Sequence, residues 1–343
     1  MRKILSLVLV GFAFSAAVAQ KSSAPPTPPT HSNGPARLSM VAMIDLPGRP
    51  AFDAAAFANN FIVVSQTGAN TIDVFDPKKR RLVAQVTNIA QPRDIAVDAK
   101  NNRIYVATAN STIAVVSSQD WEVKDSFSVD GSVDVLALSA DGVRLYVGDK
   151  TASTVTAVDT SLRKSIGSAK LTGRPEAIAI GDGGIVYVSV QDGAMIVGLD
   201  PQMKVVGQFR LQGSLPSGMV YDSASRRLYV AVRAGVLAIN ADNGTEVARV
   251  TAPRGVESLS FDPSSHLLFA AGGGSVISIS TAGGLSSLDE LLAEVKGHTL
   301  VYDPSRKLLF LPGGREGRSK MLIVKDLSQG APQEPAAAEA KLR

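Results

Sequence analysis

The chain has 343 residues, a formal net charge of +4 and no cysteine. Without cysteine it has no disulfide framework, no lipid anchor on an N-terminal cysteine and no covalent haem of the Cys-x-x-Cys-His type. The mild charge carries no strong nucleic-acid signal, because the one basic run, at 78–81, has no aromatic residues interleaved with it.

The first 19 residues have the pattern of a secretory signal peptide. Arg2 and Lys3 form a basic start, residues 4–16 are apolar, and Ala17-Val18-Ala19 fits the small-residue cleavage pattern. The apolar run is short for a transmembrane helix, so we expect no membrane span after cleavage and a periplasmic or secreted protein. Residues 20–37 and 329–343 contain few large apolar side chains, which predicts a disordered tether and a disordered tail.

The segment between them, residues 38–328, repeats an apolar strand signature with a period of about 41 residues. The signature occurs seven times, anchored at Val63, Tyr105, Tyr146, Tyr187, Tyr229, Phe269 and Phe310. A strand-rich repeat of this length is typical of propeller blades, which cannot bury both faces of their own sheet and therefore pack around an axis. The sequence predicts one all-β domain, a seven-bladed β-propeller of four-stranded blades.

Each repeat encodes short strands that are separated by polar turns. In the second repeat we expect strands over 94–97, 103–107, 112–116 and 122–129, because these runs are β-branched or aromatic and are bounded by turn residues. The last repeat lacks a fourth strand after 321–324. We expect residues 38–46 to supply it, which closes the ring and removes two open sheet edges.

One segment of the sixth repeat is ambiguous. Ser287-Leu288-Asp289-Glu290 resembles a helix capping box, and the apolar residues that follow have helical spacing. The distance along the chain between the flanking strands leaves little room for an inserted helix. We therefore expect a strand here, in which pairing with the neighbouring strand overrides the local preference.

Four of the repeats carry a tyrosine motif, and several open on a proline preceded or followed by arginine. The motifs are Tyr105-Val106-Ala107, Tyr146-Val147-Gly148, Tyr187-Val188-Ser189 and Tyr229-Val230-Ala231, with openings such as Pro92-Arg93-Asp94 and Arg174-Pro175-Glu176. These repeats resemble the YVTN family of bacterial seven-bladed propellers, the YncE-like proteins. The resemblance implies a WD-repeat-like, secreted or periplasmic propeller, often without known catalysis. The motif is degenerate in the last two repeats. It indicates the fold but does not identify a functional residue.

The central channel of a propeller is the usual place for a ligand, and the first residues of the inner strands converge there. Alignment on the opening proline places ionisable residues at five of the seven positions, with basic residues just before some of them. The predicted ring at the channel mouth consists of Arg49, Arg93, Asp134, Arg174, Glu176, Glu257 and His298. Charges of both signs around one concavity favour a small anionic or zwitterionic ligand. The alternative is a rim that is polar only because the channel contains water.

We expect a non-catalytic scaffold that binds such a ligand or a protein. One alternative is a lactone hydrolase, in which Glu176, Glu257, His298 and Arg174 would act as base and oxyanion stabiliser. A second alternative is an accessory subunit of a periplasmic redox enzyme.

No metal or cofactor is expected from the sequence. Of the three histidines only His298 falls near the channel, and no Asp-x-Asp-x-Asp calcium loop occurs. The single tryptophan, Trp121, is unlike the repeated tryptophans of pyrroloquinoline quinone propellers. Nucleophile motifs of the Ser-x-x-Lys and Gly-x-Ser-x-Gly types are also missing.

Overall fold

The chain folds into short antiparallel strands joined by tight turns. A computed structural model describes residues 37–212 and 215–328, so the predicted signal peptide, the predicted tail and all but the last residue of the predicted tether lie outside the described residues. The described residues form 28 strands and one short 3-10 helix, Asp182–Gly184. No helix among them has the length and apolar character that a bilayer crossing requires.

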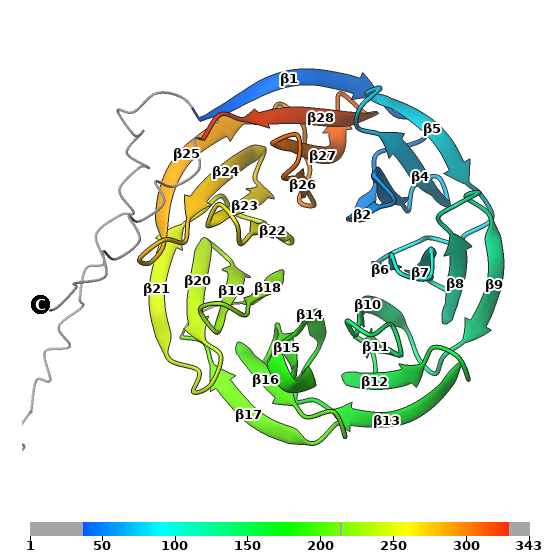
Figure 1. Cartoon of the computed structure of the whole chain (residues 1–343), viewed down its shortest axis with the longest axis vertical. Coiled ribbons are helices and arrows are strands. Elements are labelled where there is room, and N and C mark those ends of the chain that lie inside the picture. The colour runs from blue at the N-terminus through cyan, green and yellow to red at the C-terminus, as the bar shows by residue number, and fades with distance from the viewer. Residues whose placement is uncertain (1–36, 213–214, 329–343) are drawn as a thin grey trace, which may run out of the picture. The chain divides into compact units, whose positions relative to one another are not determined.

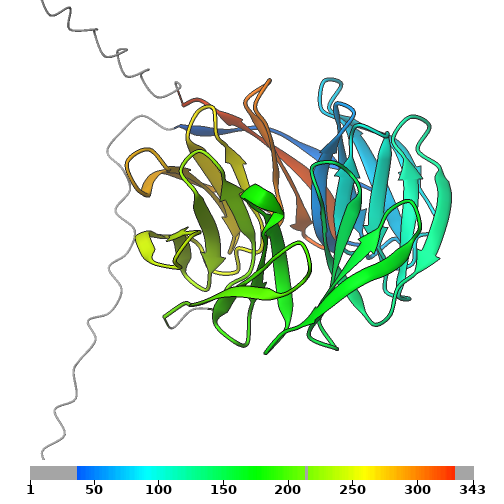
Figure 2. The ribbon, with the colours of Figure 1, turned by 60° about the horizontal axis from the view of Figure 1, so that its bottom comes forward.

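The strands form seven four-stranded sheets, or blades, arranged in a ring (Figure 1, Figure 2). Blade 1 contains β2 (Phe52–Ala58), β3 (Phe61–Gln66), β4 (Thr71–Asp76) and β5 (Arg81–Val86). Blade 2 contains β6 (Ile95–Asp98), β7 (Arg103–Ala107), β8 (Thr112–Ser117) and β9 (Val123–Ser128). Blade 3 contains β10 (Val133–Leu138), β11 (Arg144–Asp149), β12 (Thr154–Asp159) and β13 (Lys164–Lys170). The strands of blade 2 match the predicted ranges to within one residue at each end.

The next three blades have the same strand order. Blade 4 contains β14 (Pro175–Ile180), β15 (Val186–Val190), β16 (Met195–Leu199) and β17 (Val205–Arg210). Blade 5 contains β18 (Met219–Asp222), β19 (Arg227–Val232), β20 (Gly235–Asn240) and β21 (Glu246–Thr251). Blade 6 contains β22 (Leu259–Asp262), β23 (Leu267–Gly272), β24 (Ser275–Ser280) and β25 (Ser286–Leu292). The ambiguous segment is therefore the outer strand β25, as predicted.

Blade 7 is built from both ends of the described chain. It contains β26 (Val301–Asp303), β27 (Leu308–Arg315) and β28 (Arg318–Asp326), and its outer strand is β1 (Leu38–Asp45). β1 pairs antiparallel with β28, from Leu38 opposite Asp326 to Asp45 opposite Lys320. The two strands lie side by side in Figure 1. This pairing confirms the predicted closure of the ring.

Aspartates at strand ends build many of the turns. In blade 2 the Asp98 carboxylate accepts the Asn101 N–H at 3.1 Å, and Asn102 adopts a φ of 52°, which asparagine tolerates better than most residues. Equivalent aspartate turns follow other strands, at Asp76, Asp159, Asp222, Asp262 and Asp303. The Asp-Pro pairs that begin at Asp76, Asp262 and Asp303 therefore form turns.

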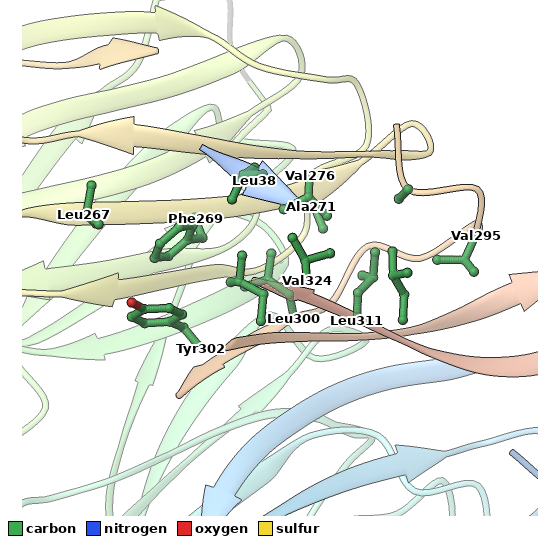
Figure 3. Close-up of a cluster of buried hydrophobic side chains, with 13 residues drawn as sticks. Leu38, Leu267, Phe269, Ala271, Val276, Val295, Leu300, Tyr302, Leu311 and Val324 are labelled. Carbon is green, nitrogen blue, oxygen red and sulfur yellow. The ribbon is translucent and has the colours of Figure 1, made fainter. Parts of the chain in front are cut away.

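The core is divided among the seven junctions between blades. Each of the seven clusters of buried apolar side chains draws residues from two neighbouring blades. In Figure 3, Phe269 of blade 6 packs near Tyr302 of blade 7, and their ring centroids are 4.5 Å apart. The seven anchor residues all lie in the second strands of their blades and are at most 6% exposed. Because each fully buried large side chain contributes about 1.5–3 kcal/mol, these junctions hold the ring together.

Strand direction sorts the loops onto two faces of the ring. Neighbouring strands of a blade are antiparallel, so the loop after the second strand and the loop into the next blade emerge on the same face. We call this the entry face, because every inner strand begins there. Arg37 and Ser328, at the two ends of the described propeller, lie on the opposite face, where Leu327 N–H donates to the Arg37 carbonyl at 2.6 Å.

A single carboxylate fastens the closing strand to the neighbouring blade. Asp289 Oδ2, on β25, accepts the backbone N–H groups of Arg37 and Leu38 at 2.6 and 2.8 Å. Leu38 is the first residue of β1, and Arg37 immediately precedes it. The contact therefore ties blade 6 to the one strand of blade 7 that comes from the far end of the chain.

We expect Asp289→Ala to lower the free energy of unfolding by about 1–3 kcal/mol, because two backbone donors lose a charged acceptor. Urea denaturation at neutral pH measures this change. Glu290→Ala is the matched control, because Glu290 is the exposed next residue of the same strand. Equal effects of the two substitutions would contradict the assigned role of Asp289.

Candidate functional site

The central channel opens on the entry face as a cavity of about 560 Å³. All seven blades contribute to its lining, mainly through the first residues of their inner strands. The charged lining residues among those described are Asp53, Arg93, Asp94, Asp134, Lys150, Glu176 and Glu257. We refer to this cavity as the channel mouth. Its volume is within the range of small-molecule sites in proteins.

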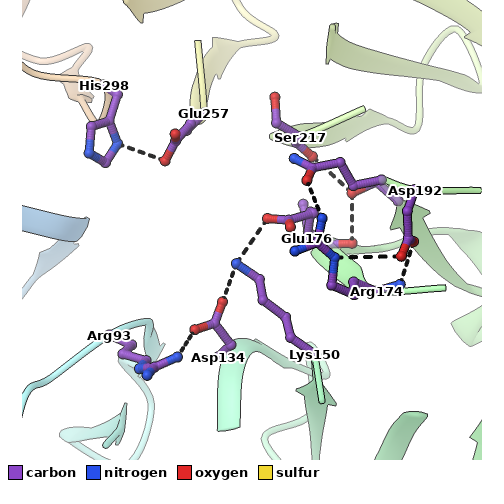
Figure 4. A network of polar contacts seen from close by, with 12 residues as sticks. Arg93, Asp134, Lys150, Arg174, Glu176, Asp192, Ser217, Glu257 and His298 are labelled. Atoms are coloured by element: carbon purple, nitrogen blue, oxygen red, sulfur yellow. Dashed lines mark hydrogen bonds and ion pairs between the residues drawn. The ribbon is translucent and has the colours of Figure 1, made fainter. Parts of the chain in front are cut away.

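A chain of alternating charges runs along one side of the channel mouth from blade 2 to blade 4 (Figure 4). Arg93 pairs with one oxygen of Asp134, and Lys150 Nζ lies 2.5 Å from the other. The same lysine lies 3.0 Å from Glu176 Oε2. The side chains of Asp134 and Glu176 are only 15% and 14% exposed, so these ion pairs are less screened than pairs on an open surface.

A second pair lies on the other side of the channel (Figure 4). His298 Nδ1 is 3.0 Å from Glu257 Oε2. The carboxylate raises the pKa of His298 above its usual value, and the imidazole lowers the pKa of Glu257. The two side chains come from the openings of blades 6 and 7, and each stabilises the charged form of the other.

Three carboxyl groups of the channel mouth hold protons more tightly than usual. Burial raises the pKa of Asp53 and Glu176, against the opposing effect of the Lys150 ammonium on Glu176. Burial raises the pKa of Asp94 to about 6, and the charges of Asp134 and Asp53 act in the same direction. The backbone N–H groups of Ile95 and Leu136, which donate to Asp94 at 2.8 and 2.7 Å, offset only part of this rise.

The structure places the predicted site residues in three groups. Arg93, Asp134, Glu176 and Glu257 line the channel mouth. His298 contacts the channel mouth through its pairing with Glu257.

The remaining two, Arg49 and Arg174, are exposed and are not among the described lining residues. Arg174 bonds to Gln191 at 3.2 Å and lies 3.5 Å from Asp192, both in the loop after the second strand of its own blade. Both arginines precede the opening proline, so they lie on the rim, outside the inner strand.

Sequence reasoning missed Lys150, Asp53 and Asp94. Lys150 follows the second strand of blade 3, and loops at that position reach the entry face because of strand direction. The residue after each tyrosine-containing strand is therefore a signal that would have found it. Asp53 lies two residues after Ala51, the aligned position of blade 1. Asp94 lies one residue after Arg93, the aligned position of blade 2. Across residues 37–212 and 215–328, no group of three or more acidic, histidine or cysteine side chains is placed to hold a metal ion.

The raised pKa of Asp94 predicts how stability depends on pH. Between pH 4 and 6 the folded state holds this proton while the unfolded state has released it, so stability falls as pH rises. We expect Asp94→Asn to flatten this fall by up to about 3 kcal/mol, as two pKa units correspond to that energy. Urea midpoints across pH 4–7 measure the slope. An unchanged slope would contradict this assignment, even though the absolute stability also drops because one N–H loses its acceptor.

Comparison with known proteins supports the fold. No protein-family model matches the chain, and no curated protein matches its sequence. Among solved structures, the chain is similar to a chain of hydrazine synthase from Kuenenia stuttgartiensis, with 14% sequence identity and a TM-score of 0.68. The similarity covers 77% of this chain and 92% of that chain. At this identity the likeness concerns the propeller fold alone, because fold and activity separate readily.

Proposed function

We propose that this protein is an exported, YncE-like β-propeller that binds a small zwitterionic ligand at the channel mouth without chemically altering it. The observation that carries the proposal is the bridged chain Arg93–Asp134–Lys150–Glu176 on the wall of a cavity of about 560 Å³. The ion pairs hold four long or flexible side chains in defined positions. A site that is ordered before the ligand arrives loses less entropy on binding.

The balance of charge favours a zwitterion over a simple anion. The described lining contains five carboxyl groups but only two cations, and each cation already lies against a carboxylate. An anion alone would add to this excess of negative charge. A ligand that carries both groups places its carboxylate near Arg93 or Lys150 and its ammonium near Asp53 and Asp94. Burial raises the pKa of both aspartates because their carboxylates are poorly solvated, and an ammonium group beside them would stabilise the carboxylate form.

The sequence motifs support the proposed YncE-like relationship and the proposed export of the protein. The four tyrosine motifs fall in the second strands of blades 2 to 5 and bury their rings between blades, which gives the repeat a structural role. The basic start, apolar run and Ala17-Val18-Ala19 support export. Arg37 and Ser328 lie on the face opposite the channel mouth, so a tether attached at either end leaves the entry face free.

We expect at least one zwitterion from a panel of amino acids and dipeptides to bind. Lys150→Gln should weaken its binding by about tenfold or more, because a charge-assisted contact contributes about 1.5–3 kcal/mol. Isothermal titration calorimetry measures the affinity. Lys124→Gln is the matched control: Lys124 also bridges two carboxylates, Asp120 at 2.7 Å and Glu122 at 2.6 Å, but on an exposed surface.

Two outcomes would overturn the proposal. One is equal affinity of the Lys150 and Lys124 variants for every ligand that binds. The other is turnover of a lactone panel by the purified protein that is lost in Glu176→Gln and Glu257→Gln. The second result would make the channel carboxylates catalytic and the protein a hydrolase.

A further inference from the structure

A second hollow, of about 480 Å³, opens between blade 1 and blade 7, the blade that closes the ring. Its described lining shares no residue with that of the channel mouth. Three segments of the entry face surround it: the loop into blade 7, the loop into blade 1 and the turn between β27 and β28. We call it the closure pocket.

The wall of the closure pocket is a hairpin that is longer than its counterparts. β27 and β28 have 8 and 9 residues, whereas the second and third strands of the other blades have 5 or 6. At about 3.3 Å per residue, the extra pairs extend the hairpin by roughly 7–10 Å. The extension contacts the loop into blade 7, where Arg315 lies 2.8 Å from a Glu294 oxygen. It forms one side of the pocket.

Backbone contacts fix this hairpin in place. Lys296 N–H donates to the Gly314 carbonyl at 2.8 Å, and Gly314 N–H donates to the Lys296 carbonyl at 2.9 Å. A Cβ atom on Gly314 would come within 3.0 Å of Pro50 Cβ, so glycine at this position lets the hairpin approach the loop into blade 1. The pocket therefore has walls that are ordered without a ligand.

The lining combines an apolar surface with one available cation. Its apolar lining residues are Pro50, Ala51, Phe52 and Pro312.

The two carboxylates of the lining lie against the same arginine. Arg315 is 2.8 Å from a Glu294 oxygen and 3.9 Å from a Glu316 oxygen. Lys296 is exposed and has no ion pair within the described residues. His298 and Arg315 of the lining each lie against a carboxylate, so Lys296 is the described lining cation that is left to pair with a ligand.

We propose that the closure pocket binds a small carboxylic acid with an apolar body, such as an aryl or branched-chain carboxylate. The carboxylate pairs with Lys296, and the apolar body covers the prolines and the alanine of the blade 1 opening. Burial of apolar surface beside a single charge pair is the usual composition of a small-ligand site. This site is separate from the channel mouth and does not depend on the function proposed there.

His298 provides a local reporter for the pocket. It lines the closure pocket, and its Nδ1 pairs with Glu257, which lines the channel mouth. A ligand in the closure pocket therefore changes the surroundings of this imidazole directly. His266 lies in the turn between β22 and β23, on the opposite face, and serves as the internal control.

The test is a titration of the full-length protein with phenylacetate, followed by the imidazole NMR signals and by calorimetry. We expect saturable shifts of the His298 signals, whereas the His266 signals should stay unchanged. The neutral isostere phenylacetamide should bind about tenfold more weakly than phenylacetate, a difference of about 1.4 kcal/mol in binding free energy. Lys296→Gln should cause a similar loss for phenylacetate, and Ala51→Phe should block the pocket. Lys150→Gln should leave phenylacetate binding unchanged.

Several results would overturn the inference. They are unshifted His298 signals, equal binding of acid and amide, or binding that survives Lys296→Gln and Ala51→Phe. Binding lost in Lys150→Gln but kept in Lys296→Gln would assign phenylacetate to the channel mouth, which contradicts the closure pocket. Because the two lysine variants report on separate sites, failure of one proposal is distinguishable from failure of the other.

Discussion

The structure depends on the burial of apolar side chains between blades. A four-stranded blade exposes two apolar faces and has no second layer of its own, so its core residues are buried only when another blade stands on each side. Each of the seven buried clusters is shared by two neighbouring blades, and one of them joins blade 7 to blade 1. The ring must therefore close for every blade to bury both of its apolar faces, and the pairing of β1 with β28 provides that closure.

Closure also determines where chemistry can gather. Strand direction sends the start of every inner strand, and the loop after every second strand, to the same face. Seven inner strands converge on one axis, so side chains that are about 40 residues apart in the chain become neighbours. Asp134 pairs with Arg93 of the preceding blade in this way, and Lys150 also joins adjacent blades through its ion pair with Glu176. Repetition brings the seven strand openings together, and the residues at those openings set the charge of the channel mouth.

The two hollows of the entry face differ in chemistry because they have different origins. The channel mouth is lined by strand openings, and its carboxylates outnumber its cations. The closure pocket lies between the extended hairpin of blade 7 and the loops into blades 7 and 1. Its surface is more apolar, and it presents one unpaired lysine. His298 lines the closure pocket and reaches a channel carboxylate, so a single side chain contacts both environments.

The sequence by itself determined the number of blades, the strands of each repeat and the closing role of the first described strand. These features follow from the repeat period and from the alternation of apolar strand runs with polar turns, which recur in every repeat. It also indicated that Arg93, Asp134, Glu176 and Glu257 lie at the channel, because they occupy one aligned column. Only the tertiary structure showed that Lys150 bridges two of them, that Arg49 and Arg174 lie outside the lining, and that a second pocket opens beside His298. Those facts depend on side-chain direction and on distances between loops of different blades, which the order of residues along one strand does not contain.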